Sequence, residues 1–178
     1  TLHSLANLLG RQDRFDEAEE AYRRSIEVGE KIGNQFHVAQ TLHSLANLLG
    51  RQDRFDEAEE AYRRSTEVGE KIGNQFHVAQ TLHSLAALLG RQDKFDEAER
   101  AYQRSIEIGR RLGNDNHLAQ VLRSYALAVE TRSPERAIEL LEESLELNRR
   151  RGNTRFIRLV ERTIEEVRKR TNRPQLGR

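Results

Sequence analysis

The stretch from Thr41 to Gln80 alternates apolar and polar positions with the period of an α-helix. Its first apolar set recurs every three or four residues and consists of Leu42, Leu45, Ala46 and Leu49. This spacing predicts a helix from about His37 to Gly50 with one apolar stripe. The second set, between Asp53 and Gly73, consists of Phe55, Ala58, Tyr62 and Val68. The stretch is therefore predicted to fold as two helices joined by a short turn, a helical hairpin.

The same forty residues occur before and after this stretch. Residues 1–40 repeat it with one change, Ile26 in place of Thr66, and residues 81–120 keep the framework with modest substitutions. A fourth, degenerate copy runs from residue 121 to about residue 154. Self-similarity at a fixed period in this range is typical of stacked supersecondary units, which bury apolar surface between neighbours. We therefore expect an elongated array of hairpins.

Polar and glycine residues mark the predicted helix ends. Asp53 stands where the second helix needs an N-cap, with Asp56 three residues later in a near capping box. Gly73 predicts the end of that helix with a positive φ, and Asn74 predicts the N-cap of the next helix. Gly69 lies inside the second helix, and two interpretations stay open: a close approach of a neighbouring backbone, or an early helix end.

The C-terminal part departs from the repeat pattern. Ser133 followed by Pro134 predicts a helix start. Beyond residue 154, one helical face is apolar and carries Phe156, Ile157, Val160, Ile164 and Val167. A terminal helix with a polar outer side is expected where no further repeat covers the array. We divide the chain into four tandem repeats at 1–154 (1–40, 41–80, 81–120 and 121–154), a capping helix at 155–170 and a flexible basic tail at 171–178.

Composition narrows the cellular setting and the class of protein. Hydrophobic residues make up 36% of the chain and charged residues 33%, as amphipathic helices require. There is no cysteine, so disulfides and thiolate chemistry are excluded, and we expect a reducing, cytoplasmic location. No apolar run approaches the roughly 20 residues of a membrane span. The chain has no methionine and opens inside a repeat, so we expect it to be part of a larger regulatory protein.

Charge argues against a dedicated nucleic-acid binder, because the net charge is only +1. The basic excess lies at the C-terminal end, where residues 121–178 hold 14 basic and 9 acidic side chains. This leaves a weaker alternative, binding of RNA or an acidic partner, which would use Arg149, Arg150, Arg151, Arg155, Arg158 and Arg162.

The repeat framework resembles the tetratricopeptide repeat. The residues that carry the resemblance are Leu42, Leu45, Ala46, Leu49, Ala58, Tyr62 and Ser65, with Asp53 and Phe55 at the turn. The phrases VAQTLHSLANLL and FDEAEEAYRRSIE most resemble the longer-repeat branch typified by kinesin light chains and many bacterial regulatory proteins. The resemblance implies an all-α fold, a right-handed α-solenoid of helical hairpins with a C-terminal capping helix. It also implies a concave wall of first helices that holds segments of other proteins.

On that wall the resemblance places a ladder of polar side chains at matching positions of successive first helices. The ladder consists of Gln40, His43, Ser44, Asn47, Arg51, Gln80, His83, Ser84, Arg91, Gln120, Arg123 and Ser124. Amide, imidazole and hydroxyl groups can donate and accept hydrogen bonds, so they can pair with the backbone of an extended peptide. The function we expect is a non-enzymatic scaffold that binds a peptide segment or a partner protein in the groove.

Other chemistry is not expected from the residues present. His43 and His83 invite a metal site, but neighbouring helices lie roughly 10 Å apart, whereas two imidazoles on one zinc must meet within about 4 Å. No carboxylate pair, Ser-His-Asp order or phosphate loop stands out, so we expect no catalytic residue, no metal and no cofactor. A second hypothesis is self-assembly, because the first helix lacks its opening turn and could dock as a homo-oligomer through Leu2, Leu5 and Leu9.

Overall fold

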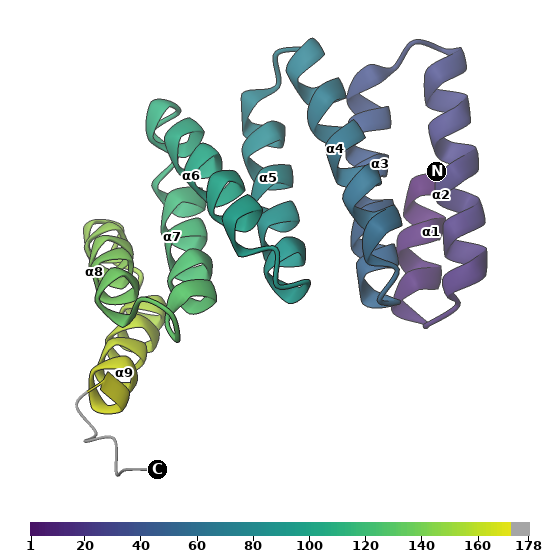
Figure 1. Cartoon of the computed structure of the whole chain (residues 1–178). Coiled ribbons are helices and arrows are strands. Elements are labelled where there is room, and N and C mark those ends of the chain that lie inside the picture. The colour runs from purple at the N-terminus through teal and green to yellow at the C-terminus, as the bar shows by residue number, and fades with distance from the viewer. Residues whose placement is uncertain (172–178) are drawn as a thin grey trace. The chain divides into compact units, whose positions relative to one another are not determined.

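The computed structural model describes residues 1–171, and in this part of the chain the backbone forms nine α-helices and no strand (Figure 1). In chain order they are α1 (Leu2–Arg11), α2 (Phe15–Lys31), α3 (Gln35–Arg51), α4 (Phe55–Lys71), α5 (Gln75–Arg91), α6 (Phe95–Arg111), α7 (Asp115–Val129), α8 (Pro134–Arg150) and α9 (Thr154–Thr171). The predicted tail lies outside the described residues, except for Thr171, which still belongs to α9.

The helices divide into two compact units. The first unit comprises residues 1–101 and the second begins at residue 102, so that the boundary falls inside α6. Each unit is described by itself below. Within the first unit, each helix packs against the next along the chain from α1 to α5, and α3 also contacts the other first helices, α1 and α5. The hairpins of this unit are therefore stacked side by side.

Glycine ends the second helices and asparagine caps the start of the next helices, as predicted. The side chain of Asn74 accepts a hydrogen bond from the backbone N–H of His77 at 3.1 Å, which caps α5. Gly73 has φ +72°, in the left-handed region that favours glycine, and α4 ends just before it at Lys71. The prediction of a glycine stop followed by an asparagine cap is confirmed.

The predicted N-cap at Asp53 is wrong. Arg54 occupies the N-cap position of α4 and makes no side-chain capping bond. Asp53 lies one residue earlier with φ +58°, and its carboxylate accepts a hydrogen bond from Arg91 at 2.8 Å. Aspartate is favoured both as an N-cap and at left-handed turn positions, so spacing alone does not separate the two roles. The left-handed backbone conformation of Asp53, and not a side-chain cap, therefore forms the turn between the two helices.

Small residues let the helices of the first unit approach closely. Ala46 and Ala58 have no exposed surface and lie in the core between the helices. A Cβ atom placed on Gly69 would lie 3.0 Å from Val78 Cγ2 and 3.1 Å from His77 Cδ2. Because α4 continues past this glycine to Lys71, the early helix end is excluded. The neighbouring helix approaches Gly69 closely, but mainly through side chains, since its nearest backbone atom, Val78 N, would lie 3.8 Å from the added Cβ.

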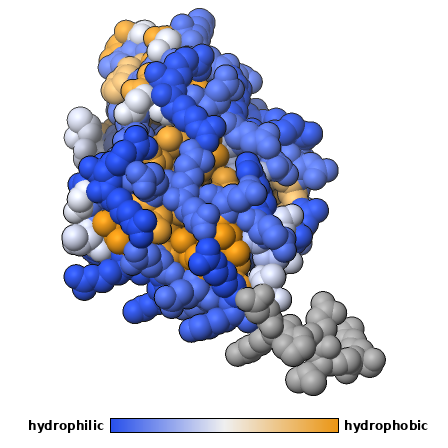
Figure 2. Space-filling view, turned by 90° about the vertical axis from the view of Figure 1, so that its left-hand side faces the viewer, coloured by the Kyte–Doolittle hydropathy of each residue, from blue (hydrophilic) through white to orange (hydrophobic). Residues whose placement is uncertain are grey.

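The second unit continues the same construction with α7, α8 and α9. α8 begins at Pro134 after Ser133, as predicted, although Ser133 makes no side-chain capping bond. α9 packs on α8 and buries Val160, Ile164 and Val167. Its charged side chains are exposed, apart from the half-buried Glu161. Figure 2 shows one face of the molecule, on which hydrophobic patches remain between hydrophilic side chains.

Candidate functional site

The polar ladder predicted from the sequence lies on the solvent side of α3, α5 and α7. Its exposed members are Gln40, Asn47, Arg51, Gln80, Arg91 and Gln120. Its half-buried members are His43, Ser44, His83, Ser84, Arg123 and Ser124. The nine residues on α3 and α5 belong to the first unit, where these two helices are in contact, and the three on α7 belong to the second unit. We name the exposed surface of α3 and α5 the first-helix face.

His43 joins α3 to the following repeat. Its Nδ1 lies 3.0 Å from Thr81 Oγ1 on α5, and its ring meets those of Tyr62 and His77 edge to face at 5.6 and 5.9 Å. Burial, together with the charge that His77 and His83 would carry, lowers the pKa of His43 to about 4. The imidazole is therefore neutral near pH 7. It acts as a contact between repeats, and the same contact recurs between His3 and Thr41 at 3.0 Å.

Asn47 is held in place from the second helix of its own repeat. The hydroxyl of Tyr62 on α4 donates to Asn47 Oδ1 at 2.7 Å, and Ser84 of the next repeat hydrogen-bonds the same tyrosine. Burial raises the pKa of Tyr62 to about 12, so the hydroxyl keeps its proton. The Asn47 side chain is exposed, and its amide N–H groups make no hydrogen bond within the described residues.

Arg91 fastens its repeat to the one before it. Its guanidinium donates to the backbone oxygen of Gly50 at 3.0 Å and to Asp53 Oδ1 at 2.8 Å, and its Cζ lies 4.9 Å from the centre of the Phe55 ring. Arg51 makes the same three contacts one repeat earlier, with a backbone oxygen, an aspartate and a phenylalanine of residues 10–15. Sequence reasoning placed both arginines in the groove and missed these contacts. The available signal was an Asp-x-Phe turn followed 38 residues later by an arginine.

The glutamines of the first-helix face are free. The side chains of Gln40 and Gln80 are exposed and make no hydrogen bond within the described residues. In the second unit, Gln120 donates to Asn116 at 3.3 Å, and the buried Nε of Arg123 has no partner among the described residues. The ladder therefore divides into groups that join repeats, such as His43 and Arg91, and amide groups that remain available to another molecule.

The arginines of the alternative site lie at the C-terminal end of the second unit. Arg149 pairs with Glu161 at 3.0 Å, so its charge is already compensated. The others are exposed and have no ion pair within residues 1–171; they are Arg150, Arg151, Arg155, Arg158 and Arg162. Binding of RNA or an acidic partner at this end remains a prediction.

Membrane-spanning helices and metal-ligand clusters are both absent from residues 1–171. None of the helices there has the length and apolar character needed to cross a membrane. Over the same residues, no three His, Cys, Asp or Glu side chains come together in a way that could ligate a metal ion.

Stacked helical hairpins joined by contacts that recur every forty residues define an α-solenoid repeat protein. The family model of the tetratricopeptide repeat matches residues 1–71 and 77–150, so the chain belongs to this family. Both the resemblance stated from the sequence and the all-α solenoid fold are thereby confirmed. Members of the family are typically non-enzymatic scaffolds for protein interactions. None of the curated proteins compared with the chain matches it.

Solved structures share the fold at low sequence identity. BtubC (BKLC) from P. vanneervenii matches with a TM-score of 0.75 and 20% identity, over 99% of this chain and 83% of that protein. A proposed kinesin light chain of Podosopora anserina with nearly identical TPR-like repeats matches with a TM-score of 0.68 and 16% identity, over 97% and 96%. A Rap protein complexed with Competence and Sporulation Factor matches with a TM-score of 0.66 and 16% identity, over 95% and 51%.

Proposed function

We propose that the chain is a non-enzymatic scaffold and that the first-helix face binds an extended segment of a partner protein. The observation that carries this proposal is the set of exposed amides on the first-helix face: those of Gln40 and Gln80 have no hydrogen-bond partner within the described residues, and that of Asn47 keeps its N–H groups unpaired while its oxygen accepts from Tyr62. The residues around them are held by contacts between repeats, so these amides are presented from a rigid surface. Rigid, spaced polar groups on a solvent-facing surface suit recognition of a peptide backbone.

The spacing of these amides fits an extended chain. Gln40 and Asn47 lie seven residues apart on one helix, about 10 Å along its axis. Gln40 and Gln80 occupy the same position of two helices in contact, whose axes lie about 8–10 Å apart. An extended segment rises about 3.3 Å per residue, so neighbouring amides would meet groups about three residues apart. An amide both donates and accepts, so it can pair with either backbone group of such a segment.

The comparisons support the general part of this proposal. The family supplies scaffolds for protein interactions, and the Rap protein similar to this chain was solved with Competence and Sporulation Factor bound. That likeness concerns the fold, so the choice of the first-helix face depends on the side chains of this chain.

The proposal is tested with peptides selected from a random display library on the whole chain. Replacing Gln40 and Gln80 together by alanine should weaken binding of the selected peptides about thirtyfold, since two hydrogen bonds of roughly 1 kcal/mol each are lost. The matched control replaces Gln35 and Gln75, which are the same residue type on the same helices about 140° around the axis. Peptides that bind both double variants as tightly as the parent chain would place the binding surface elsewhere.

A second candidate function is self-association through α1. Leu5 and Leu8 are 47% and 53% exposed on this helix, whereas Leu9 is only 7% exposed and belongs to the core. Leu2 is half-buried. A docking surface on α1 would therefore use Leu5 and Leu8 and not Leu9. Analytical ultracentrifugation across a wide concentration range should show a dimer that disappears in the Leu5→Glu, Leu8→Glu variant, and a constant monomer mass would exclude it.

A further inference from the structure

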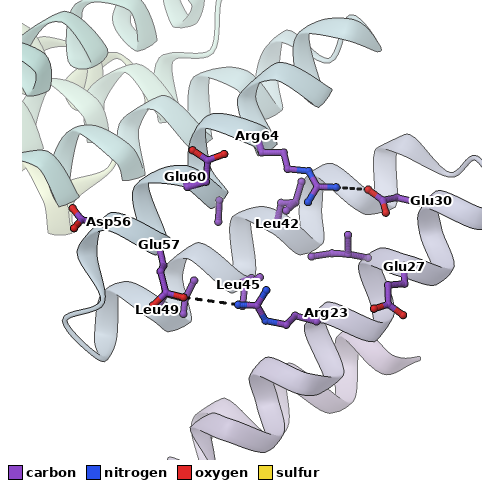
Figure 3. Close-up of a pocket in the computed structure, with 12 residues that line it drawn as sticks. Arg23, Glu27, Glu30, Leu42, Leu45, Leu49, Asp56, Glu57, Glu60 and Arg64 are labelled. Carbon is purple, nitrogen blue, oxygen red and sulfur yellow. Dashed lines mark hydrogen bonds and ion pairs between the residues drawn. The ribbon is translucent and has the colours of Figure 1, made fainter.

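A cleft lies in the first unit between the second helices, α2 and α4. The cleft has a volume of about 570 Å³, and its floor is formed by Leu42, Leu45 and Leu49 of α3 (Figure 3). The volume lies within the range of pockets that hold small ligands or side chains of a partner. The three leucines are at most 4% exposed, so each contributes only a small apolar area to the floor, to which Ile26 and Ala61 add at 6% and 8% exposed.

The rim of this cleft is acidic. Five carboxylates and two guanidiniums line it. Arg23 of α2 reaches Glu57 of α4 at 3.9 Å, and Arg64 of α4 pairs with Glu30 of α2, so that two ion pairs cross the cleft in opposite directions (Figure 3). These pairs occupy both arginines and two of the acids.

Among residues 1–171, three carboxylates on the rim have no ion pair, although the charge of Lys94 also acts on Asp56 from a longer distance. Glu27, Asp56 and Glu60 are exposed and have no ion pair within the described residues. Three negative charges beside an apolar floor attract a ligand that combines cationic and apolar groups, and they repel an anionic one. A neutral apolar ligand would leave this charge without a counterpart.

We propose that this cleft binds a basic amphipathic segment of a partner protein, with its apolar side chains on the leucine floor and its lysine or arginine side chains on Glu27, Asp56 and Glu60. Such a segment carries both groups at alternating or helical spacing. The cleft is lined by α2, α4 and three leucines of α3, whereas the first-helix face consists of the exposed polar residues of α3 and α5, so the two surfaces share no residue. The two surfaces can therefore be tested independently.

The repeats supply an internal comparison for the apolar part of the cleft. The one position at which repeats 1 and 2 differ is Ile26, which lines this cleft, and its counterpart is Thr66. Both side chains are buried to a similar degree, at 6% and 7% exposed. Ile26→Thr therefore installs a residue that the same position of the next repeat already accommodates.

The experiment uses the whole chain and a short synthetic peptide of alternating leucine and lysine, with titration calorimetry as the readout. Two matched probes replace lysine by glutamate or leucine by serine. We expect the leucine–lysine peptide to bind with an affinity that falls as the salt concentration is raised. The two matched probes should bind at least about tenfold more weakly. Equal binding of the serine–lysine probe would overturn the role of the leucine floor, and no binding of the leucine–lysine peptide would overturn the site.

Charge-removing variants locate the binding. Asp56→Asn with Glu60→Gln should weaken binding about fivefold to tenfold, because each exposed ion pair contributes at most a few-fold. The matched control is Asp16→Asn with Glu20→Gln, which removes the same charges at the same repeat positions of α2, outside the cleft. An equal effect of both double variants would show general electrostatic attraction and overturn the proposal.

The Ile26→Thr variant adds an apolar test. It should weaken binding at least about threefold, since an ethyl group is replaced by a hydroxyl and each buried CH₂ contributes about 0.8 kcal/mol. Thr66→Ile, which changes the same repeat position outside the cleft lining, should leave binding unchanged. Circular dichroism at the parent level in each variant shows that the fold is intact. Unchanged binding by a folded Ile26→Thr variant would contradict the predicted contact.

Discussion

The substitution Gly69→Ala tests how tightly the stacked hairpins meet. The new methyl group would lie 3.0 Å from Val78 Cγ2 and 3.1 Å from His77 Cδ2, closer than the 3.5–4.0 Å of an ordinary carbon contact. Neither neighbour can easily move. Val78 is fully buried, and His77 is hydrogen-bonded to Ser65 at 2.9 Å.

The same change in another repeat meets more space. At Gly109 in the second unit, the nearest atoms to an added Cβ are His117 Cδ2 at 3.5 Å and Leu118 Cβ at 3.8 Å. Alanine is favoured over glycine inside a helix by about 1 kcal/mol. Gly109→Ala should therefore stabilise the protein by about 1 kcal/mol.

At Gly69 the steric cost outweighs this gain. Extra methyl groups in a well-packed core cost about 1–3 kcal/mol. Subtracting the helix gain of about 1 kcal/mol leaves a net destabilisation of about 1 kcal/mol. The two identical substitutions should therefore differ by about 2 kcal/mol in the free energy of unfolding, with opposite signs.

Thermal unfolding followed by circular dichroism measures the difference. For a chain of this size, 1 kcal/mol changes Tm by about 2–4 °C, so Gly109→Ala should raise Tm by about 3 °C and Gly69→Ala should lower it by a similar amount. Because repeat arrays can unfold in steps, hydrogen exchange of α4 and α5 serves as a local readout. If Gly69→Ala raises Tm as much as Gly109→Ala does, the contact between α4 and α5 is not a rigid one.

Three further predictions concern two contacts between repeats and one helix cap. Arg91→Ala removes the guanidinium that contacts Gly50 and Asp53. Because Arg91 is exposed, the free energy of unfolding in urea titrations should fall by only about 1 kcal/mol. A loss no larger than that of Gln80→Ala would show that the contact is not stabilising. The pKa of His43 is about 4 in the folded chain, below its ordinary value of 6.5. The neutral imidazole therefore contributes fully to the free energy of unfolding above about pH 6.5. This contribution, about 3 kcal/mol for such a shift, is lost as pH falls toward 4. Urea titrations at several pH values should show this loss, and His43→Gln should flatten that part of the profile; an unchanged slope would contradict the assignment. Asn74→Ala removes the N-cap of α5 and should lower the free energy of unfolding by about 1 kcal/mol. A Tm equal to that of the parent chain would contradict this prediction.

Local sequence determined the helices and the hairpin repeat. The apolar spacing from Leu42 to Leu49 and the Gly73–Asn74 pair predicted where helices lie, where they stop and where they start again. The buried alanines at positions 46 and 58 were predicted in the same way. These features depend on residues within one or two helical turns of each other, or on the period of one helix. The interacting residues are therefore neighbours in the sequence and can be recognised without the tertiary structure.

Only the tertiary structure decided the roles of the polar residues. Asp53 could be a cap or a turn residue until Arg91, 38 positions later, was found beside it. His43, predicted as a free groove residue, pairs with Thr81, also 38 positions later. The acidic cleft is formed by α2, α3 and α4 together, and no single helix shows it. The forty-residue period predicts that the repeats stack, but the distance and angle between stacked helices depend on side-chain packing. That packing decides which polar groups meet each other and which remain for a partner.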